Sequence, residues 1–301
     1  MIWKLVNLII IVQNMITINK RISDTNDINI EPIKMKSLPQ IIKLSNYQIG
    51  FKLSNYQIKN WFFIFYFLLF TFYLSSCKKS ESYTSPSIAD YNPLQTGKYI
   101  TYQLDSLIYL SFGTRDTTVS YQVKYLTDSL ITDNLGRPAY RIFRYIRKNE
   151  NDSWRSDATF MSVNTGNSLE FIENNLRYVK LQMPIKDNVS WKGNSFIDTY
   201  SANSLLRYLD NWDYVYANVG AADDVSNFNF DNIITVLQRD EIIGVPDEPS
   251  SYSEVNYSQE KYAKGIGMIY RKFFHSEYQP NNGGYFADGS YGVTYTIIDH
   301  N

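Results

Sequence analysis

The sequence predicts a mainly β protein: an antiparallel meander that forms a curved open sheet, a half-barrel or a barrel, with at most one or two short helices. Three observations support this prediction. After residue 93 the chain is rich in Tyr, Val, Ile, Thr and Phe, which suit a pleated surface. These residues come in short runs, and clusters of Gly, Asn, Asp and Pro separate the runs. Strand-like runs do not alternate with helical ones, so a doubly wound parallel sheet is not expected.

The first half of this region predicts closely spaced strands. We expect them at 98–112, 117–132, 139–148 and 154–164, with two more inside 168–185. The cluster Asp-Asn-Leu-Gly-Arg-Pro, which starts at Asp133, is a strong turn signal between the second and third of these strands. Several runs are apolar on one face and polar on the other, which suits an antiparallel sheet with one wet side.

The second half contains one stretch with helical spacing, at Leu205, Leu206 and Leu209. Alternation typical of a strand returns soon afterwards, from residue 213. Further strands are expected at 232–244, 260–278 and 291–300. In total, about ten short strands joined by tight turns predict a meander-type domain.

The segment before the domain has the features of a lipoprotein signal. Trp61 to Tyr73 form an apolar run after the basic residues Lys52 and Lys59, and Leu-Ser-Ser leads to Cys77, the only cysteine in the chain. A basic start, a core of roughly 7–15 apolar residues and a small-residue cleavage zone describe a secretory signal peptide. The run is shorter than the roughly 20 apolar residues of a transmembrane helix. Because Leu-Ser-Ser-Cys resembles the lipobox of bacterial lipoproteins, we expect lipid attachment at Cys77; the alternative is a short uncleaved anchor that ends in an inert cysteine.

These features divide the chain into four parts. Residues 59–76 are the predicted lipoprotein signal peptide, residues 77–93 the lipidated cysteine and a flexible Ser-rich tether, and residues 94–301 a single antiparallel β domain. Residues 1–58 hold a tandem copy of Lys-Leu-Ser-Asn-Tyr-Gln-Ile and lie upstream of where a signal peptide normally starts. We interpret them as a miscalled or disordered N-terminal extension; the alternative is a real extension with a second apolar patch at residues 5–12.

Charge separates the same two regions and excludes one class of partner. Residues 1–77 carry eight Lys/Arg and three Asp/Glu, whereas residues 78–301 carry 21 Lys/Arg and 27 Asp/Glu. An acidic domain has no electrostatic reason to bind nucleic acid, which calls for a basic face. With one cysteine, no internal disulfide can form.

Three stretches of the domain resemble a set of uncharacterised lipoproteins from Bacteroidota. They are "YNPLQTGKYITYQLDSLIY", "LRYVKLQMPIKDNVSWKGNSF" and "KYAKGIGMIYRKF". Those proteins place a Pro-Leu-x-x-Gly-x-aromatic opening soon after the lipidated cysteine and end with an Ala-x-Gly-aliphatic-Gly strand; here Tyr99 stands where Trp is expected. The resemblance covers most of residues 91–275. It implies an envelope location and an all-β fold, and almost nothing about chemistry.

No motif in the domain predicts catalysis or a phosphate site. Gly265-Ile266-Gly267 precedes a strand rather than a helix, so we interpret it as a bulge or a close backbone approach. His275 and His300 lack the paired spacing of zinc ligands and are expected on surface strands.

The acidic residues do not predict a metal site or a catalytic site either. Asp223-Asp224 and Asp247-Glu248 lack the spaced pattern of a calcium loop and are interpreted as solvated loop charges. There is no Gly-x-Ser-x-Gly elbow, and paired carboxylates for glycoside hydrolysis would have to meet in space. We therefore expect no catalytic residue, metal or cofactor.

Aromatic residues give the best hint of function. Trp154, Trp191 and Trp212, together with many tyrosines, are candidates for stacking on a sugar ring or a lipid tail if they line a concave sheet. The alternative, which we favour, is that they fill the core or the edge of the sheet. Trp191, in the turn-like sequence Asn-Val-Ser-Trp-Lys-Gly, is the one expected to be exposed.

Three functions remain open after the sequence. The first is a non-enzymatic β scaffold or binding module that holds a ligand or protein partner at the outer membrane. The second is a lipid- or glycan-binding carrier with an aromatic-lined groove, and the third is a hydrolase whose carboxylates converge only in the fold. Expected partners are the membrane, through the lipid, and an envelope protein, glycan or lipid. Lys-Lys-Ser-Glu-Ser after Cys77 is no obvious surface-export signal, so the periplasmic face is favoured over the cell surface.

Overall fold

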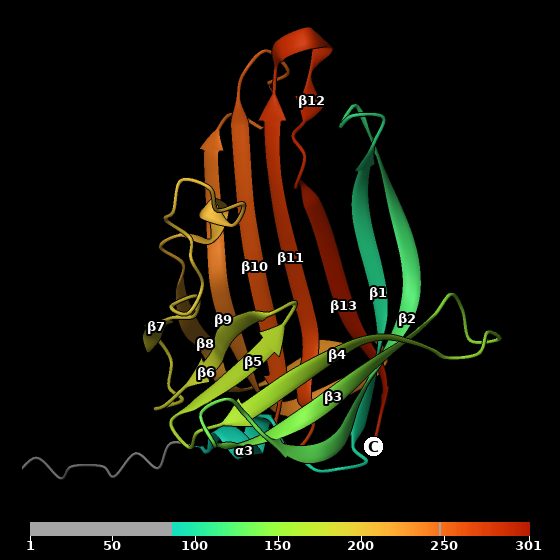
Figure 1. Cartoon of the computed structure of the whole chain (residues 1–301), viewed down its shortest axis with the longest axis vertical. Coiled ribbons are helices and arrows are strands. Elements are labelled where there is room, and N and C mark those ends of the chain that lie inside the picture. The colour runs from blue at the N-terminus through green and yellow to red at the C-terminus, as the bar shows by residue number, and fades with distance from the viewer. Residues whose placement is uncertain (1–85, 247) are drawn as a thin grey trace, which may run out of the picture. The chain divides into compact units, whose positions relative to one another are not determined.

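The computed structural model describes residues 86–246 and 248–301, which form a mainly β domain (Figure 1). In chain order the elements are α3 (Ile88–Tyr91), β1 (Tyr99–Leu110), β2 (Arg115–Thr132), β3 (Pro138–Arg147), β4 (Arg155–Asn164), β5 (Ser168–Glu173), β6 (Leu176–Gln182), β7 (Ser190–Lys192), η1 (Arg207–Leu209), β8 (Asp213–Val225), β9 (Phe228–Gly244), β10 (Ser253–Ala263), β11 (Gly267–Gln279), η2 (Asn281–Gly283), β12 (Tyr285–Phe286) and β13 (Tyr291–His300). None of the helices in these two ranges has the length and apolar character needed to cross a bilayer.

The strands form one antiparallel sheet that is nearly closed into a barrel. Their order is β6-β5-β4-β3-β2-β1-β13-β11-β10-β9-β8-β7, and β12 pairs with β11 beside this path. At the two ends of the path, the Val179 N–H donates to the Gly193 carbonyl oxygen at 2.8 Å, and the Trp191 indole N–H donates to the Val179 carbonyl oxygen at 2.7 Å. These bonds occupy backbone groups that an open edge would leave unpaired. The predicted fold class is therefore confirmed.

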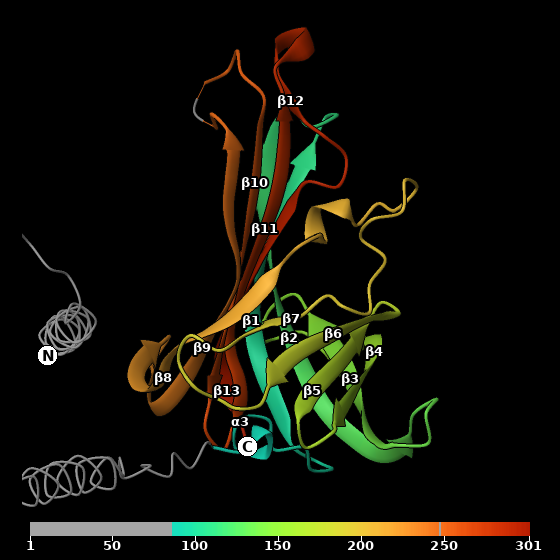
Figure 2. The same cartoon turned by 90° about the vertical axis from the view of Figure 1, so that its left-hand side faces the viewer.

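The barrel has two facing walls of different height. Strands β9, β10, β11, β13 and β1 form a tall wall, and β3 to β6 cross in front of its lower half (Figure 1); the turned view shows the two walls side by side (Figure 2). The long strand β2 joins them, because it pairs with β1 through residues 115–126 and with β3 through residues 122–132. The space between the walls is where the candidate site lies.

Helix α3 packs at the lower end of the barrel (Figures 1 and 2), next to the turn between β10 and β11. Ser87 and Asp90 form a capping box that satisfies the first backbone N–H groups of the helix. Ile88 and Tyr91 are buried, and the Gly265 N–H donates to the Asp90 carbonyl oxygen at 2.6 Å. The prediction of a flexible tether over residues 77–93 is therefore wrong at its end, since residues 87–91 belong to the folded domain.

A second correction concerns the stretch 260–278, which was predicted as one strand. It contains the end of β10, a tight turn and β11, and β10 itself begins at Ser253. Gly265 and Gly267 adopt φ values of +80° and +119° at this turn, a backbone conformation that favours glycine. The two glycines thus serve a hairpin, with no strand–loop–helix context for a phosphate.

The stretch with helical spacing gives only the single turn η1 before β8. The segment that carries η1 lies above β6 in the turned view (Figure 2). Tyr208 of this turn stacks on His275 with ring centroids 3.9 Å apart, and Trp212 stacks on Phe273 at 6.1 Å. Packing against β11 therefore decides the local structure where helical propensity is weak.

Two clusters of buried side chains form the core. One joins α3 to strands β5 through β11 and includes Trp191, Trp212 and Tyr262. The other joins β1, β2, β8 to β11 and β13 and includes Tyr102 and Tyr295.

Candidate functional site

A cavity of about 90 Å³ lies inside the barrel, between the two walls and next to the segment that follows α3. Its apolar and aromatic lining includes Ile100, Tyr102, Tyr125, Leu169, Phe171 and Met268. Asn301, which also lines the cavity, is exposed to solvent. The cavity therefore combines an apolar wall with at least one solvent-exposed lining residue.

Four charged side chains line the same cavity: Glu173, Lys180, Glu260 and Arg271. We call them the inner cluster. The Lys180 Nζ lies 2.6 Å from Glu260 Oε1. The Arg271 Nη1 lies 3.1 Å from Glu173 Oε1, and the Arg271 Nε lies 3.6 Å from Glu260 Oε1. The side chain of Glu260 is fully buried, and those of the other three are between 6% and 16% exposed. The charges of the inner cluster sum to zero.

The sheet register brings these side chains together from both walls. Glu260 of β10 and Arg271 of β11 lie directly opposite each other on the tall wall. Glu173 ends β5 on the facing wall. Between β5 and β6 the register shifts, so that Lys180 lacks a paired residue on β5. Such a bulge re-aims a side chain, and here Lys180 reaches Glu260 across the barrel.

The two carboxyl groups are held in their ionised form. Burial alone raises the pKa of Glu260, but attraction to Lys180 and Arg271 outweighs burial, and the net pKa lies below the usual value. The same balance lowers the pKa of Glu173, where the field of Arg271 is the largest opposing influence. At neutral pH the inner cluster therefore consists of two carboxylates and two cations.

The tyrosines around the inner cluster stay neutral. Burial, with the negative charge of Glu260 as the second cause, raises the pKa of Tyr102 and of Tyr262. The Tyr262 hydroxyl donates to Glu260 Oε2 at 2.6 Å, and the Tyr102 hydroxyl donates to the Met268 carbonyl oxygen at 2.7 Å. These hydroxyl groups therefore act as neutral hydrogen-bonding groups in the cavity wall.

Some N–H groups of the inner cluster do not donate a hydrogen bond. Within the described part of the chain, the Arg271 Nε is buried and has no hydrogen-bond partner. Among the same residues, the Lys180 ammonium makes one hydrogen bond, to Glu260, although it carries three N–H groups. Buried donors without hydrogen-bond partners are rare in folded proteins, so a donor of this kind suggests that a bound molecule supplies the acceptor.

This chemistry suits binding better than hydrolysis. A glycosidase needs one carboxylic acid that is protonated at working pH and one carboxylate. Here the pKa values of both Glu173 and Glu260 are lowered, and each carboxylate is paired with a cation. In this ionised form the two groups carry no proton of the kind that a general acid donates.

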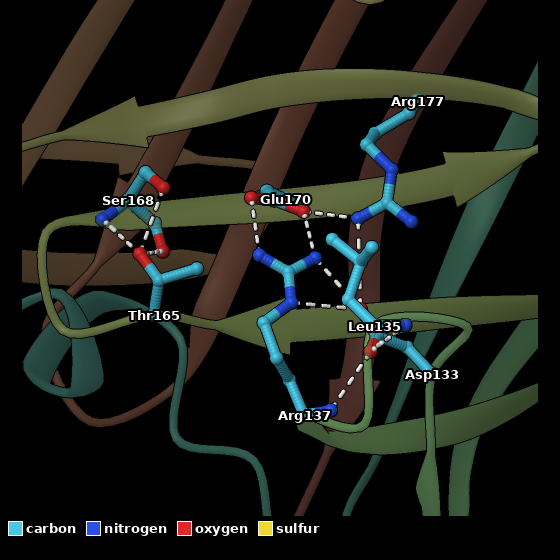
Figure 3. Close-up of polar contacts among 7 residues, drawn as sticks. All are labelled: Asp133, Leu135, Arg137, Thr165, Ser168, Glu170 and Arg177. Carbon is cyan, nitrogen blue, oxygen red and sulfur yellow. Dashed lines mark hydrogen bonds and ion pairs between the residues drawn. The ribbon is translucent and has the colours of Figure 1, made fainter.

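A second cluster of two carboxylates and two cations lies on the opposite face of β5 and β6 (Figure 3). We call Asp133, Arg137, Glu170 and Arg177 the outer cluster. Arg137 donates to both carboxylate oxygens of Glu170, at 3.0 and 2.7 Å, and also to Asp133. Arg177 contacts Glu170 from β6. Asp133 Oδ1 accepts the backbone N–H groups of Leu135 and Arg137, each at 2.9 Å. The outer cluster thus fastens the β2–β3 turn to the sheet.

The ionised form of Asp133 is strongly favoured in this arrangement. Hydrogen bonds from the Arg137 side chain, supported by the two backbone donors, lower the pKa of Asp133 to about 2. Nearby, the Ser168 backbone N–H donates to the Thr165 hydroxyl at 2.9 Å and closes the β4–β5 turn (Figure 3). These contacts give the outer cluster a structural role.

The structure does not place the predicted tryptophans in a stacking row. Trp191 is buried, so the prediction that it is exposed is wrong; its indole N–H joins the seam between β6 and β7. Trp212 is 2% exposed and packs under η1. Trp154 is half-buried, with the Arg147 guanidinium 4.3 Å from its ring centroid. None of the three lines the cavity.

The histidine prediction is corrected for one residue. His275 is buried, not on a surface strand: its Nδ1 lies 2.7 Å from Asn256 Oδ1, and its ring stacks on Tyr208. His300 is half-buried next to the ring of Phe228.

The prediction that Asp223 and Asp224 are loop charges is wrong, because both lie in strand β8. Asp223 pairs with Lys261, and Asp224 accepts a hydrogen bond from Asn229. In residues 86–246 and 248–301, no group of three or more His, Cys, Asp or Glu side chains could hold a metal ion. Asp247 and Cys77 lie outside the described residues, so the expected lipid attachment at Cys77 stays a prediction.

The sequence did not predict the inner cluster, although charged residues inside two apolar runs gave a weak indication of it. Lys180 and Arg271 interrupt the apolar runs Tyr-Val-Lys-Leu and Ile-Tyr-Arg-Lys-Phe-Phe. A charge inside such a run can face water or the core, and the period of two does not say which face is buried. The pairs that join the two walls, Lys180–Glu260 and Glu173–Arg271, are 80 and 98 residues apart in the chain, so spacing could not reveal them.

Comparison with models of protein families, with curated proteins and with solved structures finds no match to this chain.

Proposed function

We propose that this protein is an envelope lipoprotein, anchored through a lipidated Cys77, whose β domain is a binding module without catalytic activity. The observation that carries the binding function is the cavity lined by the inner cluster, where the buried Arg271 Nε has no hydrogen-bond partner among the described residues. Small-molecule sites typically combine an apolar wall with a few convergent polar groups, and this cavity has both. The ligand is held at the end of the barrel next to α3.

The anchor rests on the sequence around Cys77. An apolar run ending in Leu-Ser-Ser-Cys, followed by an acidic domain without further cysteine, fits a thiol reserved for lipid. The resemblance to Bacteroidota lipoproteins supports the same location. Within the envelope we favour the periplasmic face of the outer membrane, because no acidic export signal follows Cys77.

The size of the cavity weighs against a carrier that encloses a lipid. A cavity of about 150 Å³ holds one benzene ring, whereas this one measures about 90 Å³. An acyl chain cannot be buried in that volume. A larger envelope molecule can insert one end group and leave the remainder outside, so we propose end-group binding.

Native mass spectrometry of the protein purified from its source envelope tests the binding function. We expect a small molecule that stays bound to the wild type and is absent from the variant Lys180→Met/Glu260→Leu, which removes the ion pair but keeps the charge balance. The matched control is Lys261→Met/Asp223→Leu, because Lys261 lies next to Glu260 on β10 and its partner Asp223 belongs to β8. A bound molecule that is retained equally by all three proteins, or by none, would contradict the proposal.

Intact mass measured on the same preparation tests the anchor. We expect the mass of residues 77–301 plus acyl chains. An unmodified chain of 301 residues would refute lipidation at Cys77 but would leave the binding function standing.

A further inference from the structure

We infer that the cavity takes an uncharged polar head group, which accepts hydrogen bonds from Lys180 and Arg271 and is carried on a short apolar body. This inference rests on the proposed function, because it names the ligand chemistry of the same cavity. Hydroxyl, ether, carbonyl and amide groups belong to this class. Carboxylates, phosphates and amines do not.

The charge balance of the inner cluster is the first reason. Glu173 and Glu260 are ionised, and Lys180 and Arg271 neutralise them within contact distance. A bound anion would bring a third negative charge into a buried site with two cations, and a bound cation would create the opposite excess. Burial of a charge without its own partner is costly, whereas a neutral group leaves the balance intact.

The entrance does not change this balance. Lys98 also lines the cavity, and its Nζ donates to the Gly265 carbonyl oxygen at 3.3 Å in a solvent-exposed setting. Water and salt screen a charge in that position. Lys98 can attract an anion to the opening, but it does not offset an additional charge at Glu260.

The hydrogen-bonding capacity is the second reason. The Glu260 carboxylate already receives Lys180 at Oε1 and Tyr262 at Oε2, and Glu173 receives Arg271 at both oxygens. What is left over in the described residues is donor capacity: the buried Arg271 Nε makes no hydrogen bond, and Lys180 makes one, with the Tyr178 ring centroid 4.9 Å from its Nζ. A ligand that accepts hydrogen bonds satisfies them.

The apolar wall and the volume give the third reason. Leu169, Phe171 and Met268 line the cavity together with the inner cluster, so a polar head there must be joined to apolar atoms. The volume of about 90 Å³ is below that of a benzene site of about 150 Å³. A head group with a few carbon atoms fills the cavity.

Three four-carbon probes of matched shape separate the alternatives: butyramide, butyrate and butylammonium. Each is titrated into the full-length wild-type protein, and the side-chain NMR signals of Lys180 and Arg271 are followed. We expect saturable shifts with butyramide, and binding weaker by about tenfold or more with each charged probe because its charge must lose its water. The affinities of the three probes are ranked on the wild-type protein, so this test does not require any variant to fold.

The outcomes distinguish this inference from the proposed function. If butyrate or butylammonium binds as tightly as butyramide, the inference of a neutral head is overturned while the binding function stands. If none of the three probes shifts the two signals, both are overturned. We also expect butyramide shifts at Arg271 to vanish in Lys180→Met/Glu260→Leu and to persist in Lys261→Met/Asp223→Leu.

Discussion

The inner and outer clusters each take one carboxylate from β5 and one cation from β6, but their other two members come from different parts of the chain. β5 supplies Glu170 outward and Glu173 inward, and β6 supplies Arg177 outward and Lys180 inward. Side-chain alternation, together with the bulge at Lys180, sends one pair to each face.

The difference lies in how fully the donors are used. In the outer cluster, Arg137 makes a two-bond contact with Glu170, and Asp133 accepts backbone N–H groups as well. In the inner cluster the buried Arg271 Nε lies 3.6 Å from Glu260 Oε1 and makes no hydrogen bond within the described residues. The outer cluster, whose members hydrogen-bond to one another, holds a turn in place. The inner cluster has a donor without an acceptor beside a cavity, so it can bind a ligand there.

Breaking the inner cluster should cost the most stability. Glu260→Gln leaves Lys180 and Arg271 with one carboxylate between them in a buried site. Loss of one partner of a buried ion pair typically costs about 3–5 kcal/mol, and we expect a decrease of that size in the free energy of unfolding. Urea denaturation followed by circular dichroism measures it.

The control for this prediction is Lys180→Met/Glu260→Leu, which removes both charges of the pair. Since apolar replacement of a buried ion pair is often close to neutral, we expect the double variant to be more stable than Glu260→Gln. The opposite order would show that the Lys180–Glu260 pair does not behave as a buried ion pair.

Breaking the outer cluster should cost less. Glu170→Gln removes charged hydrogen bonds from Arg137 and Arg177, but both arginines are 20% to 29% exposed and can be rehydrated. Hydrogen bonds to charged groups are worth about 1.5–3 kcal/mol, so the expected loss lies in that range. The same urea titration serves as the measurement, and a loss as large as that of Glu260→Gln would remove the distinction between the clusters.

Acid should weaken the outer cluster in a defined pH range. Because the pKa of Asp133 is lowered to about 2 in the folded protein, its ionised form stabilises the fold above the unfolded pKa of about 3.9. That stability is lost as pH falls from about 5 toward 2. Urea midpoints measured across this range should fall less steeply for Asp133→Asn than for the wild type. Equal slopes would contradict the role given to Asp133.

An exposed ion pair should have the smallest effect. Lys192 and Asp213 lie 2.9 Å apart on β7 and β8, with side chains 56% and 61% exposed. Pairs of this kind contribute little because water and salt screen them. We expect Asp213→Asn to change the free energy of unfolding by less than about 0.5 kcal/mol. A larger change in the urea midpoint would show that the β7–β8 edge depends on this charge.

Much of the fold could be predicted because its signals are local. Alternation in the residue runs and turn clusters such as the one at Asp133 act within a few residues. The site could not be predicted in this way. The partner of Lys180, Glu260, comes from β10 on the facing wall, and Trp191 is buried where β6 and β7 meet at the barrel seam. Both depend on pairings that no local pattern specifies.

The most direct test of this account compares arginines of the two clusters in one NMR experiment. The side-chain Nε–Hε signals of Arg271, Arg137 and Arg177 are recorded as butyramide is added to the full-length protein. We predict a saturable shift for Arg271, whose buried Nε makes no hydrogen bond among the described residues, and no shift for Arg137 or Arg177. A silent Arg271, or equal shifts of all three arginines, would contradict the assignment of the inner cluster as the ligand site.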